Sequence, residues 1–194
     1  SILLNKQAMI YGDAAVAAMA IVTKVFQILF SVLIGFGQGF QPVIGFNYGA
    51  RKFHRLKRAF WLSVAAGSAV TFLGAMGAQF FPEYIARAFT TDSDLIEKTA
   101  QALRISTVAF WAVGFQIVST NLFQSLGLAG KSIFLSLTRQ ILFLLPLIYI
   151  FSSVLGLQGV WMAYATSDIV ATLVTTVMVI FQMRKINKLV RENS

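Results

Sequence analysis

Long apolar stretches that are almost free of charged side chains limit most strongly how this chain can fold. Charged residues make up 12% of the sequence and hydrophobic residues 57%, and the charged ones cluster between the apolar stretches. A helix crosses a bilayer core about 30 Å thick with about 20 mainly apolar residues. A soluble domain of this length could not bury five such stretches in one core. We therefore predict an all-α fold, a polytopic transmembrane helix bundle.

The breaks between the apolar stretches divide the chain into predicted spans. The five spans cover about residues 14–48, 60–81, 103–128, 132–154 and 157–182, and a basic tail follows over residues 183–194. Residues 1–11 are too few to cross a bilayer at about 1.5 Å rise per residue. We interpret them as part of a helix whose beginning is missing, so the sequence is expected to be a C-terminal fragment.

Basic residues gather in alternate connections, which predicts the orientation of the chain. The connections on one side carry Arg51, Lys52, Arg55, Lys57, Arg58, Lys131, Arg184, Lys185, Lys188 and Arg191. Short cytoplasmic loops are the ones enriched in Lys and Arg, and the intervening connections here are acidic or uncharged. We expect a multi-pass protein of the cell (inner) membrane with a cytoplasmic C-terminus. A net charge of +9 confined to such loops does not indicate a nucleic-acid partner.

The predicted spans lack the groups from which active sites and metal sites are built. The chain has no cysteine, its one histidine is His54 in a basic loop, and Asp168 is the one acid deep in a span. An intramembrane enzyme needs a nucleophile–base pair, paired carboxylates or metal ligands. We therefore expect no enzymatic activity, no metal site and no cofactor.

The stretch GFGQGFQPVIGFNYGARK, residues 35–52, places helix breakers and amides inside or just after the first predicted span. On a helix it forms two adjacent stripes, Gly35, Gly39, Pro42 and Phe46 on one and Gln38, Gln41, Gly45 and Gly49 on the other. Small residues four apart allow close helix packing, and a proline kinks a helix by freeing a carbonyl. The stretch is either a packing kink or a hinge that lines a cavity with the amides of Gln38, Gln41 and Asn47.

Asp168 lies near the middle of the last predicted span, on one face with Tyr164. An ionisable group inside a membrane is a candidate functional site, because inserting it costs about 2.5–3.5 kcal/mol. Either Asp168 forms a structural ion pair, with Lys24 or Arg139 as the two candidates, or it carries a proton or a cation. A buried ammonium would repel a cationic substrate, so Lys24 is expected to be paired or to face away from a cavity.

Several stretches resemble the multidrug and toxic compound extrusion (MATE) family. GFGQGFQPVIGFNYGARKFHRLKRAF is similar to the end of the second helix of each half of those transporters, and its QP…NYGA form is closer to the C-terminal half. NLFQSLGLAGKSIFLSLTRQILFLLPLIYI resembles the tenth helix, the cytoplasmic link and the eleventh helix. GLQGVWMAYATSDIVATLVT resembles the start of the twelfth. The resemblance implies that residues 1–194 form the C-terminal lobe of a twelve-helix transporter, a six-helix lobe with five full spans and a partial first helix.

The resemblance implies export of amphipathic, often cationic, compounds by antiport with sodium ions or protons, through alternating access of two lobes. The expected partners are a small-molecule substrate, the lipid bilayer and the missing N-terminal lobe. Some family members carry acids on the seventh and tenth helices, whereas the third span here offers the amides Gln116, Asn121 and Gln124. A coupling carboxylate is therefore expected in the missing lobe, unless it is Asp168.

These considerations give one set of candidate cavity residues and leave two alternative functions open. The candidates are Gln38, Gln41, Asn47, Asn121, Gln124 and Tyr164. The first alternative is a flippase for lipid-linked or polysaccharide precursors, from the same superfamily. The second is a helical membrane fragment that does not transport.

Overall fold

The computed structural model describes residues 13–192, and every secondary structure element in that part of the chain is helical. The elements are α2 (Asp13–Gly49), α3 (Phe53–Phe80), α4 (Pro82–Arg87), α5 (Ser93–Ser106), η1 (Phe110–Ala112), α6 (Val113–Ser125), α7 (Ala129–Leu137), η2 (Thr138–Leu144) and α8 (Leu145–Glu192). The predicted all-α bundle is confirmed. The predicted partial helix over residues 1–11 lies outside the described residues.

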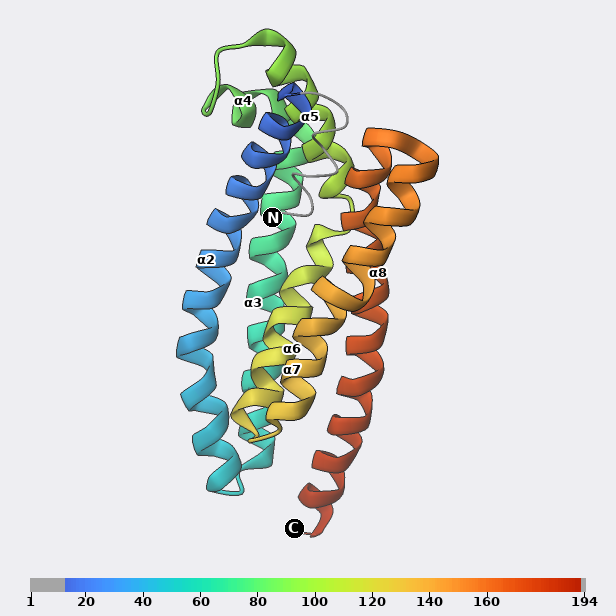
Figure 1. The fold of residues 1–194 in the computed structure, drawn as a ribbon. Coiled ribbons are helices and arrows are strands. Elements are labelled where there is room, and N and C mark those ends of the chain that lie inside the picture. Colours follow the sequence, from blue (N-terminus) through green and yellow to red (C-terminus); the bar gives the residue numbers. More distant parts are fainter. Residues whose placement is uncertain (1–12, 193–194) are drawn as a thin grey trace.

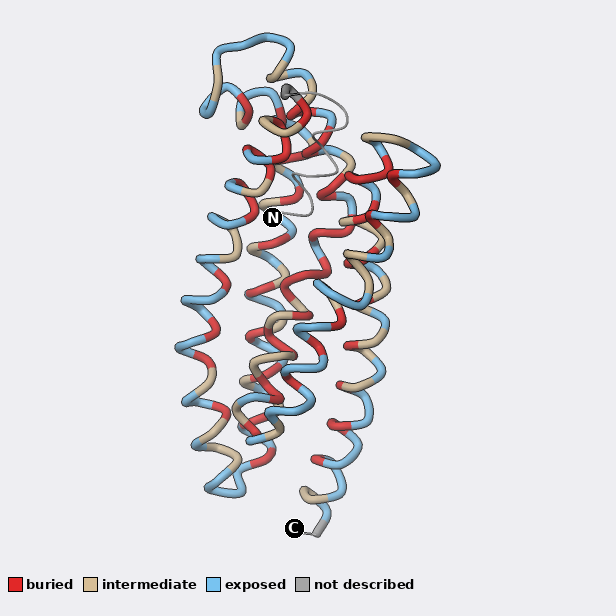
Figure 2. Tube along the Cα trace, in the orientation of Figure 1, coloured by how far each residue is buried: buried red, intermediate tan, exposed pale blue. Residues whose placement is uncertain are grey.

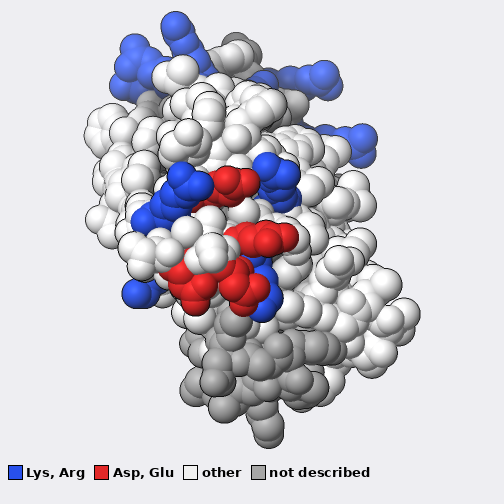
Figure 3. Space-filling view, turned by 90° about the horizontal axis from the view of Figure 1, so that it is seen from above, with Lys and Arg blue, Asp and Glu red and all other residues white. Residues whose placement is uncertain are grey.

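The helices form an elongated bundle (Figure 1), and its two ends differ in the charge of their connections. The loop between α2 and α3, the start of α7 and the C-terminal end of α8 lie together, and these segments hold the basic connections. We call this the basic end. Figure 3 looks onto the opposite end, where acidic side chains of α4 and α5 gather. The two kinds of connection predicted from the charge pattern therefore lie at opposite ends of the bundle.

The helix α8 consists of two antiparallel arms that meet at Gly156. Gly156 has φ 62° and ψ −139°, a conformation that side chains rarely allow, and the chain reverses direction there (Figure 1). Arg139 contacts Asp168, and Lys131 contacts Gln182. Residues further before the turn thus meet residues further after it, as an antiparallel hairpin requires.

Three described helical segments are long and apolar enough to cross a membrane: Ala15–Gly49, Phe53–Phe80 and Ala129–Arg191. The third contains the turn at Gly156 and therefore contributes two passes. The bent pair Ser93–Ser106 and Phe110–Ser125 qualifies as a further span when its two parts are taken together. Each predicted span overlaps one of these segments.

The predicted span over residues 103–128 is not one continuous helix. Its two parts meet at an angle of 54°, although no proline or glycine lies between Ser106 and Val113. The hydroxyl of Thr107 donates to the carbonyl oxygen of Leu103 at 2.7 Å, and such local bonds compete with the helical pattern. A search of the sequence for helix breakers therefore does not detect this break.

Side chains of α3 satisfy backbone groups that the break leaves free. Thr71 Oγ1 lies 3.0 Å from the carbonyl oxygen of Trp111, and Gln79 Nε2 donates to the carbonyl oxygen of Arg104 at 2.7 Å. Irregular backbone at membrane depth is tolerated only where protein or a water-filled cavity satisfies it. The bent span therefore depends on α3.

Replacing Thr71 by valine is expected to lower the free energy of unfolding by about 1–3 kcal/mol, because the isosteric side chain leaves the Trp111 carbonyl without its donor. Thermal unfolding of the purified chain in detergent measures this loss. Thr23→Val is the matched control, since the Thr23 hydroxyl bonds the Met19 carbonyl within its own helix. Equal losses in the two variants would contradict the role given to Thr71.

Two apolar clusters fill the interior of the bundle, and buried positions follow one face of each helix (Figure 2). The cluster nearer the acidic end includes Val22, Phe26, Phe110 and Trp161, and the one nearer the basic end includes Ile44, Phe60, Phe123 and Ile186. Along α2 and α6, the segments around Phe30 and Gln116 lie between these clusters. A site at this level therefore has one apolar cluster on each side of it along the bundle axis.

The helices α3 and α6 approach most closely at two glycines. A Cβ atom on Gly114 would overlap the backbone carbonyl of Gly67, so α6 needs glycine at this crossing. On α2 the close contact is at Gly37, where an added Cβ would overlap the side chain of Asn121. None of these three glycines was among the predicted packing positions.

The glycines predicted to pack closely do not do so within the described bundle. Apart from the adjacent residues and turns of α2 itself, no described atom lies within 4 Å of a Cβ added at Gly35, Gly39 or Gly49, and Gly45 has one ordinary contact at 3.8 Å. The reason is the rotation of α2 about its axis, because Gly37 faces α6 and the predicted glycines face other directions. Pro42 lies inside α2, which continues without interruption to Gly49.

Candidate functional site

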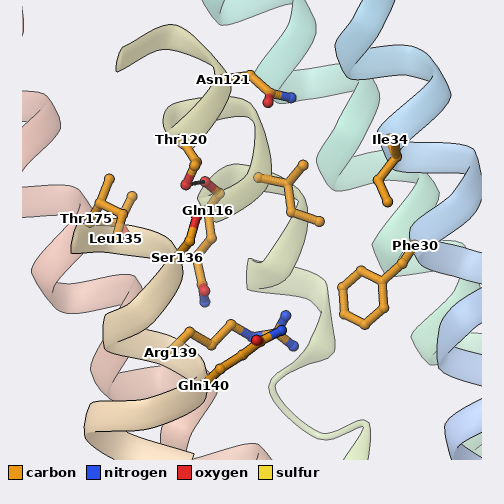
Figure 4. A pocket seen from close by; sticks show the side chains of 11 residues that line it. Phe30, Ile34, Gln116, Thr120, Asn121, Leu135, Ser136, Arg139, Gln140 and Thr175 are labelled. Atoms are coloured by element: carbon orange, nitrogen blue, oxygen red, sulfur yellow. Dashed lines mark hydrogen bonds between the residues drawn. The ribbon is translucent and has the colours of Figure 1, made fainter. Parts of the chain in front are cut away.

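A pocket of about 430 Å³ lies in the middle of the bundle, between α2, α6, the α7–η2 arm and α8 (Figure 4). Its walls are formed by Phe30, Ile34, Gln116, Ile117, Thr120, Asn121, Leu135, Ser136, Arg139, Gln140 and Thr175. Small-molecule sites are typically clefts of about 300–1,000 Å³ with apolar walls and a few placed polar groups. The size and lining of the pocket both fit that description.

The polar wall formed by Arg139 and Gln140 comes from an irregular helical segment. Residues of η2 follow a π-helical pattern, which is rare and is found often at functional sites. Pro146, two residues beyond η2, has no N–H to donate, and proline is a common cause of local departures from the α-helix. The widened turn sets the direction in which Arg139 leaves the helix.

Arg139 forms a buried ion pair with Asp168. Its Nε donates to Asp168 Oδ1 at 2.7 Å, and the side chains are 19% and 3% exposed. The guanidinium carbon also lies 4.9 Å from the ring centroid of Phe30, and Figure 4 shows the side chain reaching from η2 toward that ring. Of the two basic candidates for Asp168, the structure therefore selects Arg139. Lys24 is exposed and forms no ion pair with the described residues.

Gln116 connects this ion pair to α6. Its Nε2 donates to the backbone oxygen of Asp168 at 2.9 Å and to Thr172 Oγ1 at 2.6 Å. Buried amides are found hydrogen-bonded, because an unpaired one is costly in an apolar interior. The two donors of the Gln116 amide thus hold α6 against the second arm of α8 at the level of the ion pair.

Three predicted cavity amides meet between α2 and α6. Gln41 Nε2 lies 3.2 Å from Asn121 Oδ1 and 3.4 Å from Gln124 Oε1. Asn121 also lines the pocket and packs against Gly37. The structure brings these three amides together, and of the three only Asn121 is part of the pocket wall.

Three predicted cavity residues lie elsewhere. Gln38 is exposed and is not part of the pocket lining, and Asn47 Nδ2 donates to the Val43 carbonyl in its own helix. Tyr164 packs edge-on against Phe26, with ring centroids 5.8 Å apart, in the cluster nearer the acidic end. Their assignment to a substrate cavity stays a prediction, because they do not line this pocket.

Among the pocket residues that were not predicted as site residues are Thr120, Ser136 and Gln140. Ser136 and Gln140 follow each other at a spacing of four within an apolar span, which is the signal that could have found them. Thr120 donates to the backbone oxygen of Gln116 and has no such periodic signal.

Sequence comparison identifies a family model and curated proteins that are similar to this chain. The MatE family model matches residues 1–150. The multidrug export protein MepA of Staphylococcus aureus (strain MSSA476) is 26% identical over 151 residues, which are 77% of this chain and 33% of MepA. An FAD transporter of Shewanella oneidensis is 25% identical over 156 residues, 80% of this chain and 34% of that protein. The chain therefore spans about a third of the length of the curated relatives it matches.

Solved structures share the fold. The outward-facing structure of a multidrug resistance MATE family transporter matches with a TM-score of 0.88 and 22% identity, over 96% of this chain and 43% of that one. The MATE multidrug transporter DinF-BH matches with a TM-score of 0.82 and 31% identity, over 95% of this chain and 42% of that one. With the family model covering most of its length, this multi-pass membrane chain belongs to the MATE family.

Proposed function

We propose that this chain forms the C-terminal lobe of a secondary transporter that exports amphipathic organic compounds, with the pocket beside Phe30 and Arg139 as part of the substrate path. The observation that carries the proposal is a pocket with aromatic and amide walls at the middle of a membrane-spanning bundle. Transporter sites lie at this depth and are built from interrupted helices. Here η2 and the break between α5 and α6 are such interruptions.

The names of the relatives support the proposed class of activity. MepA is named a multidrug export protein, and DinF-BH is named a multidrug transporter. We propose the same class of activity here, driven by inward flow of sodium ions or protons through alternating access of two lobes. In the cell (inner) membrane, the basic end of the bundle would face the cytoplasm, and the C-terminus would lie on that side.

The proposal is tested with the full-length gene product that contains this chain, expressed in cells whose own exporters are deleted. Ethidium should accumulate less in these cells than in cells carrying the empty vector. Imposing sodium and proton gradients separately in proteoliposomes should show which ion drives export. Normal membrane insertion without export of ethidium under either gradient would contradict the proposal, and translocation of a lipid-linked precursor alone would favour the flippase.

Two phenylalanines on α2 allow the role of the pocket in export to be tested. Phe30→Ala is expected to reduce efflux of an uncharged aromatic substrate about two- to tenfold, because aromatic contacts contribute about 0.5–1.5 kcal/mol beyond burial. Phe36→Ala is the control, since Phe36 is exposed on the same helix and is not part of the pocket lining. Initial efflux rates at equal expression measure the difference. An equal reduction in both variants would show that the pocket is not the route.

A further inference from the structure

We propose that this pocket binds the carboxylate end of an aromatic compound, and that Arg139 determines this preference. The proposal rests on the proposed function in taking the pocket as a substrate site, and it specifies the chemistry that the pocket selects. A lipophilic cation would have to place its charge outside the pocket.

The charge of the lining is the first observation. Among the described residues that line the pocket, Arg139 is the one charged side chain, and the rest are apolar, hydroxyl or amide groups. A bound cation would meet a guanidinium with no carboxylate in the wall to compensate it. Like charges in a low-dielectric site repel strongly, whereas an anion there gains an attractive partner.

The donors of the guanidinium are the second observation. Arginine has five N–H donors, and Nε of Arg139 is used by Asp168. Within residues 13–192 its two Nη groups make no hydrogen bond. They belong to a side chain that is 19% exposed and lines the pocket, so they are available to a bound acceptor. Planar guanidinium groups bind carboxylates with two parallel bonds.

Asp168 reduces the positive charge of Arg139 but does not compete for the pocket. Its side chain is 3% exposed and is not part of the lining, so a ligand meets the Nη groups before it meets the carboxylate. The partial compensation limits the expected preference to about tenfold or somewhat more, the range of one or two charged hydrogen bonds. Asp168 acts as a positioning residue that holds the guanidinium in place.

The aromatic requirement comes from Phe30. Its ring lies over the guanidinium at 4.9 Å and forms the opposite wall of the pocket, as Figure 4 shows. A planar ligand whose carboxylate reaches the Nη groups would lie against this ring and against Ile34 beside it on α2. Offset or edge-on aromatic contacts add to the affinity of such a ligand.

The test uses the full chain in nanodiscs of uncharged lipid and three fluorescent probes with one aromatic group: pyrenebutyrate, its methyl ester and pyrenylbutyl-trimethylammonium. Binding is measured by titration, with the signal of empty nanodiscs subtracted. We expect pyrenebutyrate to bind at least about tenfold more tightly than either other probe. Equal affinity for the three probes, or tightest binding of the ammonium probe, would overturn the proposal.

Variants assign the preference to Arg139. The double variant Arg139→Gln/Asp168→Asn removes both charges together and avoids leaving a lone buried carboxylate, so it keeps the fold testable. It should lose the preference for pyrenebutyrate while binding the methyl ester as before. Lys24→Gln removes one exposed positive charge away from the pocket and should keep the preference. A preference that survives in the double variant would overturn the assignment.

The outcomes separate this inference from the proposed function. Export of ethidium by the unmodified protein together with equal binding of the three probes would overturn the inference and leave the proposed function standing. Binding of pyrenebutyrate that depends on Arg139 in a protein that exports none of the compounds would support the binding site and contradict the transport proposal.

Discussion

Arg139→Met alone should lower the free energy of unfolding by about 3–5 kcal/mol, one of the two largest effects expected in this chain. The reason is the partner left behind, because Asp168 is almost fully buried and would lose the guanidinium that pairs with it. Thermal unfolding in detergent, followed by loss of the monodisperse peak in size-exclusion chromatography, measures the loss.

The double variant Arg139→Met/Asp168→Leu should recover most of that stability, because replacing a buried pair by apolar side chains of similar volume is often neutral. Together with Asp168→Leu the variants form a double-mutant cycle, which isolates the energy of the pair. Lys24→Met controls for the loss of a positive charge in a span. Losses in the two single variants that simply add in the double variant would contradict a coupled pair.

Gly114→Ala is expected to destabilise the bundle by about 1–3 kcal/mol or more, as overpacking does at close contacts. The added methyl group would overlap the backbone carbonyl of Gly67, and backbone atoms cannot move aside as the end of a flexible side chain can. The helices α3 and α6 would have to separate, which would also shift Gln116 on the pocket wall.

Gly77→Ala is the matched control for Gly114→Ala, since both glycines lie in helices and no described atom lies within 4 Å of a Cβ added at Gly77. It should be neutral or slightly stabilising, because alanine favours the helix. The melting temperatures of the two variants in one detergent give the comparison. A Gly114→Ala protein as stable as Gly77→Ala would show that the helices do not cross as closely as described.

Hydrophobic stretches and loop charges predicted the helical passes because those features are local. The reversal between the last two passes shows this well, since Gly156 marks it in both the sequence and the backbone. The break between α5 and α6 was missed for the opposite reason. It depends on Thr71 and Gln79, which are distant in sequence from the carbonyls they contact.

The candidate site was predictable in its chemistry and less so in its geometry. Unusual polar groups in apolar spans indicated Asp168, Asn121 and Arg139, and the structure brings all three to the pocket or next to it. The sequence left Lys24 and Arg139 as equal partners for Asp168. The choice between them depends on helical phase, and the π-helical turn at Arg139 changes that phase in a way that a regular 3.6-residue period does not anticipate.

A π-helical turn is an α-helix with one residue inserted, so η2 fixes the alignment between the two halves of its span. Each residue of an α-helix advances by about 100° around the axis, since about 3.6 residues make one turn. Removing one residue from η2 would restore a regular helix and rotate α7 about its axis relative to the segment after Pro146. Ser136 and Arg139 would then leave the pocket wall together. The length of this segment is therefore as much a part of the site as the residues it presents.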